Sequence, residues 1–307
     1  MAATTKRYAV VTGGNKGIGF EICRQLASNG VLVVLTARDE NRGLQAVQKL
    51  RDGDPALSDN LVFHKLDVAD SSSISSLADF IRTQFGKLDI LVNNAGIFGA
   101  TMDVDGSRLV PLFVLFGSIL LIYLSSSKQW LESITDTYEL AEECLKTNYH
   151  GAKQMIETFL PLLQQSDLPR IVNVSSGLGK LKNVKHEWAT SVLSDVENLT
   201  EEKVEQVLNQ YLKDFKEGSL ATKGWPRGAS AYTLSKAALN GYSRIIAKKY
   251  PNLCINCVCP GYVKTDINQN TGFRTPDEGA EGPVKLALLP YGGPSGRFFD
   301  QTEEGSF

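Results

Sequence analysis

Residues 12–19 read TGGNKGIG, and this glycine-rich stretch decides how the surrounding chain is interpreted. It follows the apolar run YAVV at residues 8–11 and opens a segment in which Ile18, Ile22 and Leu26 recur at helical spacing. Glycines at positions 13, 17 and 19 let the backbone turn sharply and approach a pyrophosphate, which then meets the positive end of the helix. By itself the spacing Gly-x3-Gly-x-Gly is a weak indication, because many turns need glycine.

Outside this stretch, apolar runs alternate with segments of helical period, which indicates parallel strands joined by crossover helices. The strands expected after residues 8–11 are VLVVLTA (31–37), LVFHKLD (61–67), LDILVN (88–93), RIVNVSS (170–176), LCINCVC (253–259) and GRFFD (296–300). Further helices are expected at 41–51, 71–85, 137–163 and 230–249. The pattern predicts an α/β fold over residues 1–307: a single Rossmann-type, doubly wound parallel sheet of about seven strands with helices on both faces.

Two insertions interrupt the alternation. The longer one covers about 180–227 and contains an amphipathic stripe, preceded by Thr200 with Glu201 and Glu202 in a first turn, which predicts an inserted extra helix. The stripe consists of Val204, Val207, Leu208, Tyr211, Leu212 and Phe215. The other insertion is an atypical apolar flap at about 107–128.

The composition excludes several classes of protein. A hydrophobic content of 42% and a charged content of 21% are ordinary globular values, and a net charge of −2 gives no basic field for nucleic acid. The N-terminus shows no apolar region of a signal peptide, and the five cysteines are odd in number, so we expect reduced thiols in the cytoplasm. Cys254, Cys257 and Cys259 are best interpreted as part of a buried strand, since no histidine stands at ligand spacing from them, and no metal is expected.

The end of the second strand favours NADPH over NADH. A cofactor with a free ribose 2′-hydroxyl needs an acidic side chain there, but the chain reads TARDENR. Arg38 and Arg42, with Lys16 from the glycine loop, would suit a 2′-phosphate, whereas Asp39 is expected to point away. The competing interpretation is that both arginines are solvated surface residues.

The stretch YTLSK places Tyr232 and Lys236 four residues apart, on one face of a helix. A lysine ammonium beside a phenol favours the phenolate, so we expect Lys236 to lower the pKa of Tyr232 from about 10 and to make it a proton donor near neutral pH. A solvent-facing helix is the alternative for this spacing.

Taken together, these stretches resemble the short-chain dehydrogenase/reductase family. Seven motifs carry the resemblance, in the order of the family and over nearly the whole chain: TGGNKGIG (12–19), LDV (66–68), NNAG (93–96), KTNY (146–149), VNVSS (172–176), YTLSK (232–236) and PGYVKT (260–265). The 55 residues between Ser176 and Tyr232, together with TARDENRG, are similar to monomeric carbonyl reductases, above all to the plant group of salutaridine reductase and the menthone/neomenthol reductases.

The resemblance implies a role for each matching residue. Tyr232 would protonate the carbonyl oxygen as hydride arrives from the nicotinamide, and Lys236 would tune that phenol and hold the ribose. Ser176, rather than Ser175, would orient the substrate carbonyl, and Asn148 would position a water that relays protons to Lys236. Asp67 would contact the adenine, Asn93 the adenosine side of the cleft, and Thr265 the carboxamide. The complete expected cofactor set is Gly13, Asn15, Lys16, Gly17, Ile18, Gly19, Arg38, Arg42, Asp67, Val68, Asn93, Ala95, Gly96, Tyr232, Lys236, Pro260, Gly261, Val263 and Thr265.

The expected function is that of an NADPH-dependent carbonyl reductase. It would transfer hydride to a small, largely apolar ketone or aldehyde, terpenoid-like or alkaloid-like, and would run in reverse as an alcohol dehydrogenase. The insertion would add a helix where other family members place a dimer interface, so a monomer is expected.

The apolar flap leaves two alternatives open. Residues 109–124 carry no charge, but sixteen residues at ~1.5 Å each span only ~24 Å of a hydrocarbon core of ~30 Å, and one crossing would separate motifs that belong to one sheet. We therefore expect no transmembrane span, while peripheral membrane contact through 109–124 stays open. The other alternative is a mis-spliced or non-productive isoform that keeps the cofactor fold but has a disrupted substrate flap.

Overall fold

The computed structural model describes residues 6–102 and 134–307. The flap at 107–128, and with it the membrane contact and splicing alternatives, lies outside the described residues. Within the described part, no helix combines the length and the apolar character that a membrane crossing requires.

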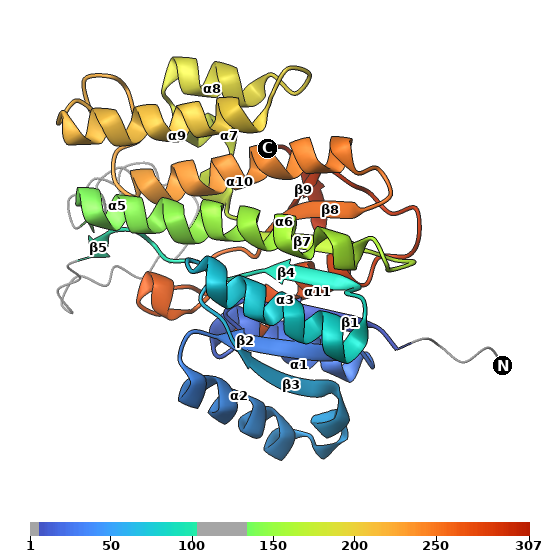
Figure 1. Cartoon of the computed structure of the whole chain (residues 1–307). Coiled ribbons are helices and arrows are strands. Elements are labelled where there is room, and N and C mark those ends of the chain that lie inside the picture. The colour runs from blue at the N-terminus through green and yellow to red at the C-terminus, as the bar shows by residue number, and fades with distance from the viewer. Residues whose placement is uncertain (1–5, 103–133) are drawn as a thin grey trace, which may run out of the picture.

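One central sheet organises the chain (Figure 1). Its eight strands lie in the order β10-β9-β8-β7-β4-β1-β2-β3, and every neighbouring pair is parallel except β9 and β10. The strands are β1 (Tyr8–Val11), β2 (Leu32–Ala37), β3 (Leu61–Lys65), β4 (Ile90–Asn93), β7 (Arg170–Val174), β8 (Cys254–Cys259), β9 (Arg297–Asp300) and β10 (Glu303–Gly305). The seven predicted strands are confirmed, and β10 is an additional antiparallel strand at the edge. A separate small ladder pairs β5 (Thr101–Met102) with β6 (Ile134–Thr135).

Helices cover both faces of the sheet, because side chains of each strand alternate between two cores. Val10 packs with α3, α6 and α10 on one face, whereas Ala9 and Val11 pack with α1, α2 and α11 on the other. The α-helices are α1 (Gly17–Ser28), α2 (Glu40–Gly53), α3 (Ser71–Phe85), α5 (Tyr138–Leu145), α6 (Ala152–Leu163), α7 (Leu181–Val184), α8 (Glu187–Ser194), α9 (Glu201–Lys216), α10 (Ser230–Lys249) and α11 (Pro276–Ala287). Short helical turns are η1 (Pro55–Asn60), η2 (Lys146–Gly151), η3 (Gly177–Gly179) and η4 (Asp266–Asn268). The predicted doubly wound fold is confirmed.

Local capping explains several helix boundaries. Asp70 caps the start of α3 by accepting a hydrogen bond from Ser72 N, and Gly86 ends that helix in the left-handed conformation at φ +70°. Thr200 caps α9 in the same way, accepting from Lys203 N, so the predicted inserted helix is confirmed. The helix expected at 137–163 is interrupted by one π turn, η2, between α5 and α6.

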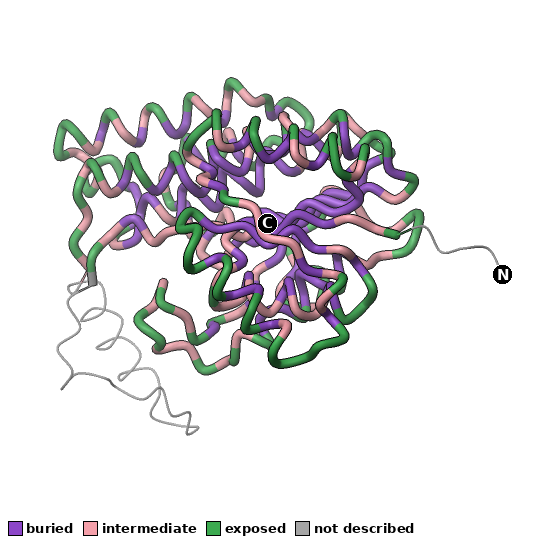
Figure 2. The backbone as a smooth tube through the Cα atoms, turned by 60° about the horizontal axis from the view of Figure 1, so that its bottom comes forward, coloured by how far each residue is buried: buried purple, intermediate pink, exposed green. Residues whose placement is uncertain are grey.

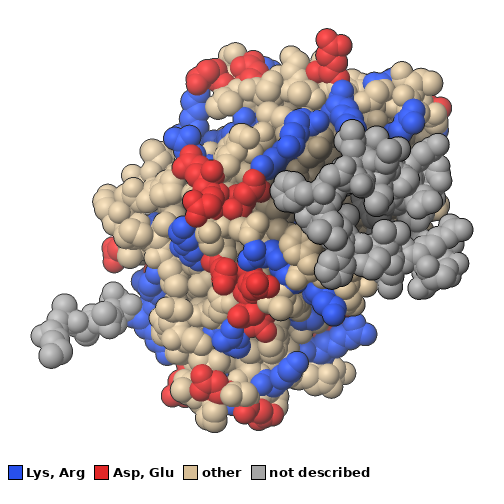
Figure 3. Space-filling view, turned by 180° about the vertical axis from the view of Figure 1, so that it is seen from behind, with Lys and Arg blue, Asp and Glu red and all other residues tan. Residues whose placement is uncertain are grey.

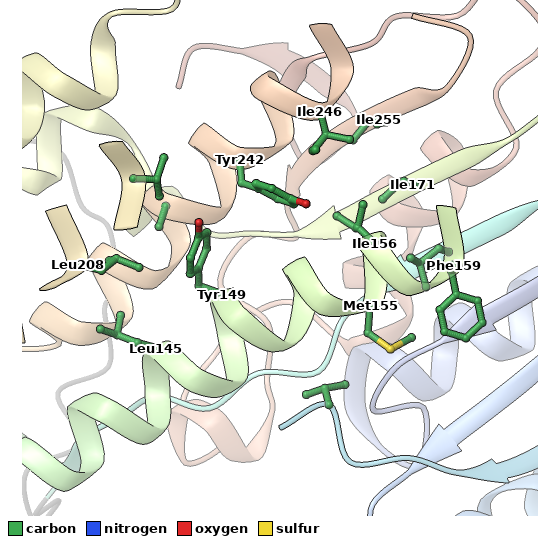
Figure 4. Packing of buried hydrophobic residues seen from close by; sticks show 14 of the residues in the cluster. Leu145, Tyr149, Met155, Ile156, Phe159, Ile171, Leu208, Tyr242, Ile246 and Ile255 are labelled. Atoms are coloured by element: carbon green, nitrogen blue, oxygen red, sulfur yellow. The ribbon is translucent and has the colours of Figure 1, made fainter. Parts of the chain in front are cut away.

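The buried residues form two continuous cores, one on each face of the sheet (Figure 2). In the larger one, the rings of Tyr149 of η2 and Tyr242 of α10 pack edge to face with their centres 6.2 Å apart (Figure 4). Met155, Ile156 and Phe159 continue this core along α6. Because the π turn and α10 pack through these rings, the residues that they carry are held in a fixed relation.

The surface mixes both signs of charge. On the face seen in Figure 3, Lys and Arg side chains are interspersed with Asp and Glu. Ion pairs such as Arg24–Asp277, Lys180–Asp300 and Lys248–Glu197 join elements that are distant in the sequence.

Candidate active site

A cavity of about 920 Å³ opens at the carboxyl ends of the parallel strands. The loops after β1, β2, β3, β4, β7 and β8 line it, together with the first turns of α10. β1 lies between β4 and β2, so the strand order reverses at this point, which is where doubly wound sheets bind their ligands.

The glycine loop forms one wall of the cavity, and its backbone depends on glycine. Gly13 and Gly17 have φ values of +64° and +54°, and a Cβ on Gly19 would lie 2.3 Å from Gly13 O. Asn94 fastens the loop, since its Nδ2 donates to Thr12 O at 2.9 Å and to Gly13 O at 3.2 Å. Helix α1 starts at Gly17 without a capping side chain, so its first N–H groups are available to an anion. This cradle fits the pyrophosphate of a dinucleotide.

The three positively charged side chains predicted to bind a 2′-phosphate do not all lie at the cavity. Arg38 and Lys16 line the cavity, whereas Arg42 does not: it lies in the first turn of α2 with 71% of its side chain exposed. Asp39 points away from the cavity as expected and caps α2 by accepting from Arg42 N at 2.9 Å. Lys16 Nζ pairs with Asp266 Oδ2 at 2.5 Å across the cavity wall. The geometry therefore favours Arg38 over Arg42 as a phosphate ligand.

Most of the remaining predicted cofactor residues also line the cavity. They are Asn15, Ile18, Asp67, Val68, Ala95, Gly96, Pro260, Gly261, Val263 and Thr265. Thr265 lies against the glycine loop, because its Cγ2 is 3.3 Å from where a Cβ on Gly17 would be. Asn93 is the exception: it is buried in β4 and donates from Nδ2 to Asn173 Oδ1 at 2.8 Å. Asn94, which was not among the expected cofactor residues, lines the cavity instead.

Tyr232, Lys236 and Ser176 meet on one side of the cavity. Lys236 lies one helical turn after Tyr232 on α10, with its Nζ 5.6 Å from the centre of the tyrosine ring, and donates to Val174 O at 2.8 Å. Ser176 follows β7, lines the same cavity, and its side chain interacts with the phenol of Tyr232. These three groups can bind a carbonyl oxygen and supply it with a proton.

The expected lowering of the tyrosine pKa is wrong for this arrangement. Burial raises the pKa of Tyr232 well above its ordinary value, and the interaction with the Ser176 side chain offsets only part of that effect. Burial also lowers the pKa of Lys236, from 10.5 to about 8. Loss of solvent therefore has a larger effect on the pKa of both groups than the charge of a neighbouring side chain.

The two serines after β7 have different surroundings. Ser175 Oγ is buried and donates to Asn240 Oδ1 at 2.7 Å, which is a contact within the core. Ser176 Oγ accepts from Leu178 N at 3.1 Å and lies beside Tyr232. The geometry thus favours Ser176 as the residue that contacts a substrate.

Asn148 is buried behind the cavity in the π turn η2, a type of turn that is frequent at functional sites. Its Oδ1 accepts from Ile97 N at 2.8 Å, and its Nδ2 donates to Ile97 O at 2.9 Å and to Ser235 Oγ at 3.0 Å. Ser235 Oγ donates in turn to Tyr232 O at 2.8 Å, so Asn148 is joined to the helix of the tyrosine. A Cβ on Gly96 would lie 3.2 Å from Asn148 Oδ1 and 3.5 Å from Lys236 Nζ, which places both groups around this glycine.

Four apolar or aromatic side chains that were not among the expected site residues also line the cavity. They come from three loops: Ile97 and Phe98 after β4, Leu178 after β7, and Tyr262 after β8. The ring centre of Phe98 lies 5.6 Å from that of Tyr232. Ile97 and Phe98 directly follow the NNAG motif, Leu178 lies two residues after VNVSS, and Tyr262 lies within PGYVKT, but only the fold brings the three loops together.

Comparisons with known proteins agree with this geometry. The family model described as short chain dehydrogenase matches residues 7–110 and 218–274. Over its full length the chain is 56% identical to the full length of (+)-neomenthol dehydrogenase of Arabidopsis thaliana. It is 36% identical to carbonyl reductase (NADPH) 1 of Bos taurus, over 95% of each chain. The solved structure of salutaridine reductase from Papaver somniferum superposes with a TM-score of 0.87 at 53% identity, covering 96% of this chain and 99% of that one.

Proposed function

The chain belongs to the short-chain dehydrogenase family, and from this premise we propose that it is an NADPH-dependent carbonyl reductase. Membership of this family and the names of the relatives directly support an oxidoreductase that acts on C=O and CH–OH groups. The finer proposal covers the cofactor, the substrate class and the roles of the residues. The arrangement of Tyr232, Lys236 and Ser176 around one cavity is the observation that supports it most.

NADPH, when bound, supplies the hydride for the carbonyl carbon. Ser176 holds the carbonyl oxygen, and Tyr232 gives its phenolic proton to that oxygen as negative charge develops on it, so the C=O group becomes CH–OH. Lys236 stabilises the phenolate that remains until the proton is replaced. Asn148, joined to Tyr232 through Ser235, holds the water that returns the proton through Lys236. The same groups act in reverse when an alcohol is the substrate.

The positively charged side chain of Arg38, directly after β2, supports NADPH rather than NADH as the cofactor. Arg38 lines the cavity where an acidic residue would contact a ribose 2′-hydroxyl, and a guanidinium suits a phosphate. Lys16 also lines the cavity, where its ammonium group pairs with Asp266. Two of the relatives, from Bos taurus and Mus musculus, are named for NADPH, which agrees with this proposal.

The apolar lining supports a small, largely apolar ketone or aldehyde, terpenoid-like or alkaloid-like. Ile97, Phe98, Leu178 and Tyr262 offer hydrophobic contact within the cavity that holds the reacting groups, and the ring of Phe98 lies against that of Tyr232. The relatives named neomenthol dehydrogenase and salutaridine reductase fit such a substrate class.

We also propose a monomer in the cytoplasm. Helix α9 of the insertion packs along α5 and α10, and so occupies a face of those helices that would otherwise be open to a partner (Figure 1). All five cysteines are unpaired, which suits a reducing compartment.

The test is a panel of cyclic terpenoid ketones, alkaloid ketones and aldehydes, with consumption of NADPH as the readout and NADH in parallel. We expect turnover of at least one apolar ketone with NADPH, a much lower rate with NADH, and formation of NADPH when the product alcohol is supplied with NADP⁺. Lack of turnover across the panel with either cofactor would contradict the proposal.

A further inference from the structure

Helix α10 carries the proposed catalytic residues but starts without a cap of its own. Ala229, the residue before it, is in the left-handed conformation at φ +49° and its side chain has no hydrogen-bonding group. The first residues of the helix are Ser230, Ala231 and Tyr232, so the tyrosine lies within its first turn. The first turn of an uncapped helix frays most easily, because its N–H groups lack partners within the helix.

A carboxylate from a distant part of the chain lies at this helix start. Asp136, 94 residues before Ser230, stands between β6 and α5. Ser230 Oγ donates to Asp136 Oδ2 at 3.4 Å, and the Ser230 backbone N–H interacts with the same carboxylate. The side-chain bond is long, so the attraction between a carboxylate and the positive end of a helix adds to it.

The surroundings of Asp136 strengthen this contact. Its Oδ1 is buried and has no hydrogen-bond partner among the described residues, so nothing there competes for the carboxylate. Burial raises the pKa of Asp136, and the bonds from Ser230 oppose that effect. Tyr211 of α9 lies on the other side of Ser230, with 2.7 Å between their hydroxyl oxygens, and fixes the serine from the insertion.

We propose that Asp136 caps α10 in place of a local cap and is thereby a positioning residue for Tyr232. The proposal rests on the proposed function only in taking Tyr232 as the proton donor. The cap joins the segment between β6 and α5 to the helix that carries Tyr232. In this role Asp136 contacts neither substrate nor cofactor.

The experiment compares Asp136→Ala with Asp136→Asn, because asparagine caps helices about as well as aspartate. We expect Asp136→Ala to lower kcat roughly tenfold, a factor equal to about 1.4 kcal/mol. The Kd for NADPH should stay within twofold of wild type, and Asp136→Asn should restore most of kcat. Thr200→Ala, which removes the cap of α9, is the matched control: it should lower Tm without changing kcat.

Hydrogen exchange gives a readout that does not depend on turnover. Amides of the first turn of α10 should exchange faster in Asp136→Ala than in wild type or in Asp136→Asn, and those near Lys249 should not change. If wild type reduces no carbonyl compound, the proposed function fails, and this measurement still tests the cap.

Two results would overturn the proposal: a kcat of Asp136→Ala within twofold of wild type, or an Asp136→Asn variant that loses as much activity and protection as Asp136→Ala. If Asp136→Ala does not fold, Ser230→Ala takes its place, because it removes the side-chain bond to Oδ2. It should lower kcat and speed exchange in the first turn, and wild-type values of both would equally overturn the proposal.

Discussion

The ammonium nitrogen of Lys236 lies 5.6 Å from the centre of the Tyr232 ring and donates to Val174 O rather than to the phenol. Burial lowers the pKa of the lysine to about 8 and raises that of the tyrosine, so it shifts both groups toward their neutral forms. Tyr232 therefore keeps its proton until a substrate oxygen can take it. In the proposed mechanism the lysine must stay charged to stabilise the phenolate, so we expect the rate of reduction to fall as the pH rises through about 8.

The buried lysine predicts a pH dependence of stability. Below about pH 8 Lys236 is charged in both the folded and the unfolded protein. Burying the charged ammonium group then lowers the free energy of unfolding by its full amount. As pH rises from about 8 toward 10.5 the folded protein releases the proton first, so the penalty disappears. Relative to Lys236→Met, wild type should gain roughly 3 kcal/mol of unfolding free energy across this window. Urea unfolding of both proteins at pH 7 and pH 10.5 measures this, and a difference independent of pH would contradict it.

The neighbouring serines should separate activity from stability. Ser176→Ala removes the hydroxyl beside Tyr232 and should lower kcat about 100-fold with little change in Tm. Ser175→Ala leaves Asn240 Oδ1 without its donor in the core and should cost about 1–3 kcal/mol of stability. Steady-state kinetics and thermal unfolding of both variants check this; the reverse pattern would show that the wrong serine has been assigned.

The two arginines near β2 should differ in their effect on the cofactor. Arg38→Ala should weaken NADPH binding about 10–100-fold, the range for a charge-assisted hydrogen bond to phosphate, and should leave NADH binding unchanged. Arg42→Ala is the matched control, since its side chain is exposed and does not line the cavity, and should change neither affinity more than threefold. Fluorescence titration with both cofactors gives the values, and equal effects of the two substitutions would refute the distinction.

A buried carboxylate holds the end of the insertion together. Asp214 accepts from Lys223 Nζ at 2.6 Å, Gln210 Nε2 at 2.7 Å and Trp225 Nε1 at 2.8 Å. Burial alone would raise its pKa, but these bonds outweigh burial and hold the pKa below its usual value. Asp214→Ala should cost about 2–4 kcal/mol of unfolding free energy, because it leaves buried donors unpaired. The exposed Asp195→Ala should cost less than about 0.5 kcal/mol, and equal losses in urea unfolding would contradict the account.

The sheet was predictable from sequence because its strands are buried on both faces and read as continuous apolar runs. Helix α11 was missed, since PDEGAEGPVKLA contains two glycines and an internal proline. Its glycines serve packing: a Cβ on Gly282 would lie 2.3 Å from Gln301 O, and one on Gly279 would lie 2.7 Å from Val263 Cγ2. Tertiary contact therefore overrides local propensity there. Strand β10, Glu303–Gly305, has no apolar pattern because it is an exposed edge.

The candidate site was predictable where a motif fixes the backbone, as in the glycine loop and the first turns of α10. It was not predictable where the direction of a side chain depends on its exact position in a strand. Asn93 is buried against Asn173, whereas the adjacent Asn94 contacts the glycine loop. The apolar lining and Asp136 depend on contacts between distant segments, which no local pattern encodes.

The central claim is that Tyr232 donates the proton in an NADPH-dependent reduction. Rates of NADPH oxidation by wild type and by Tyr232→Phe, with the best ketone from the panel and with the Kd for NADPH measured in both, test it most directly. We predict a Kd within threefold of wild type and a kcat lower by about 10²–10⁴-fold in the variant. A Tyr232→Phe enzyme that binds NADPH and turns over at the wild-type rate would contradict the account.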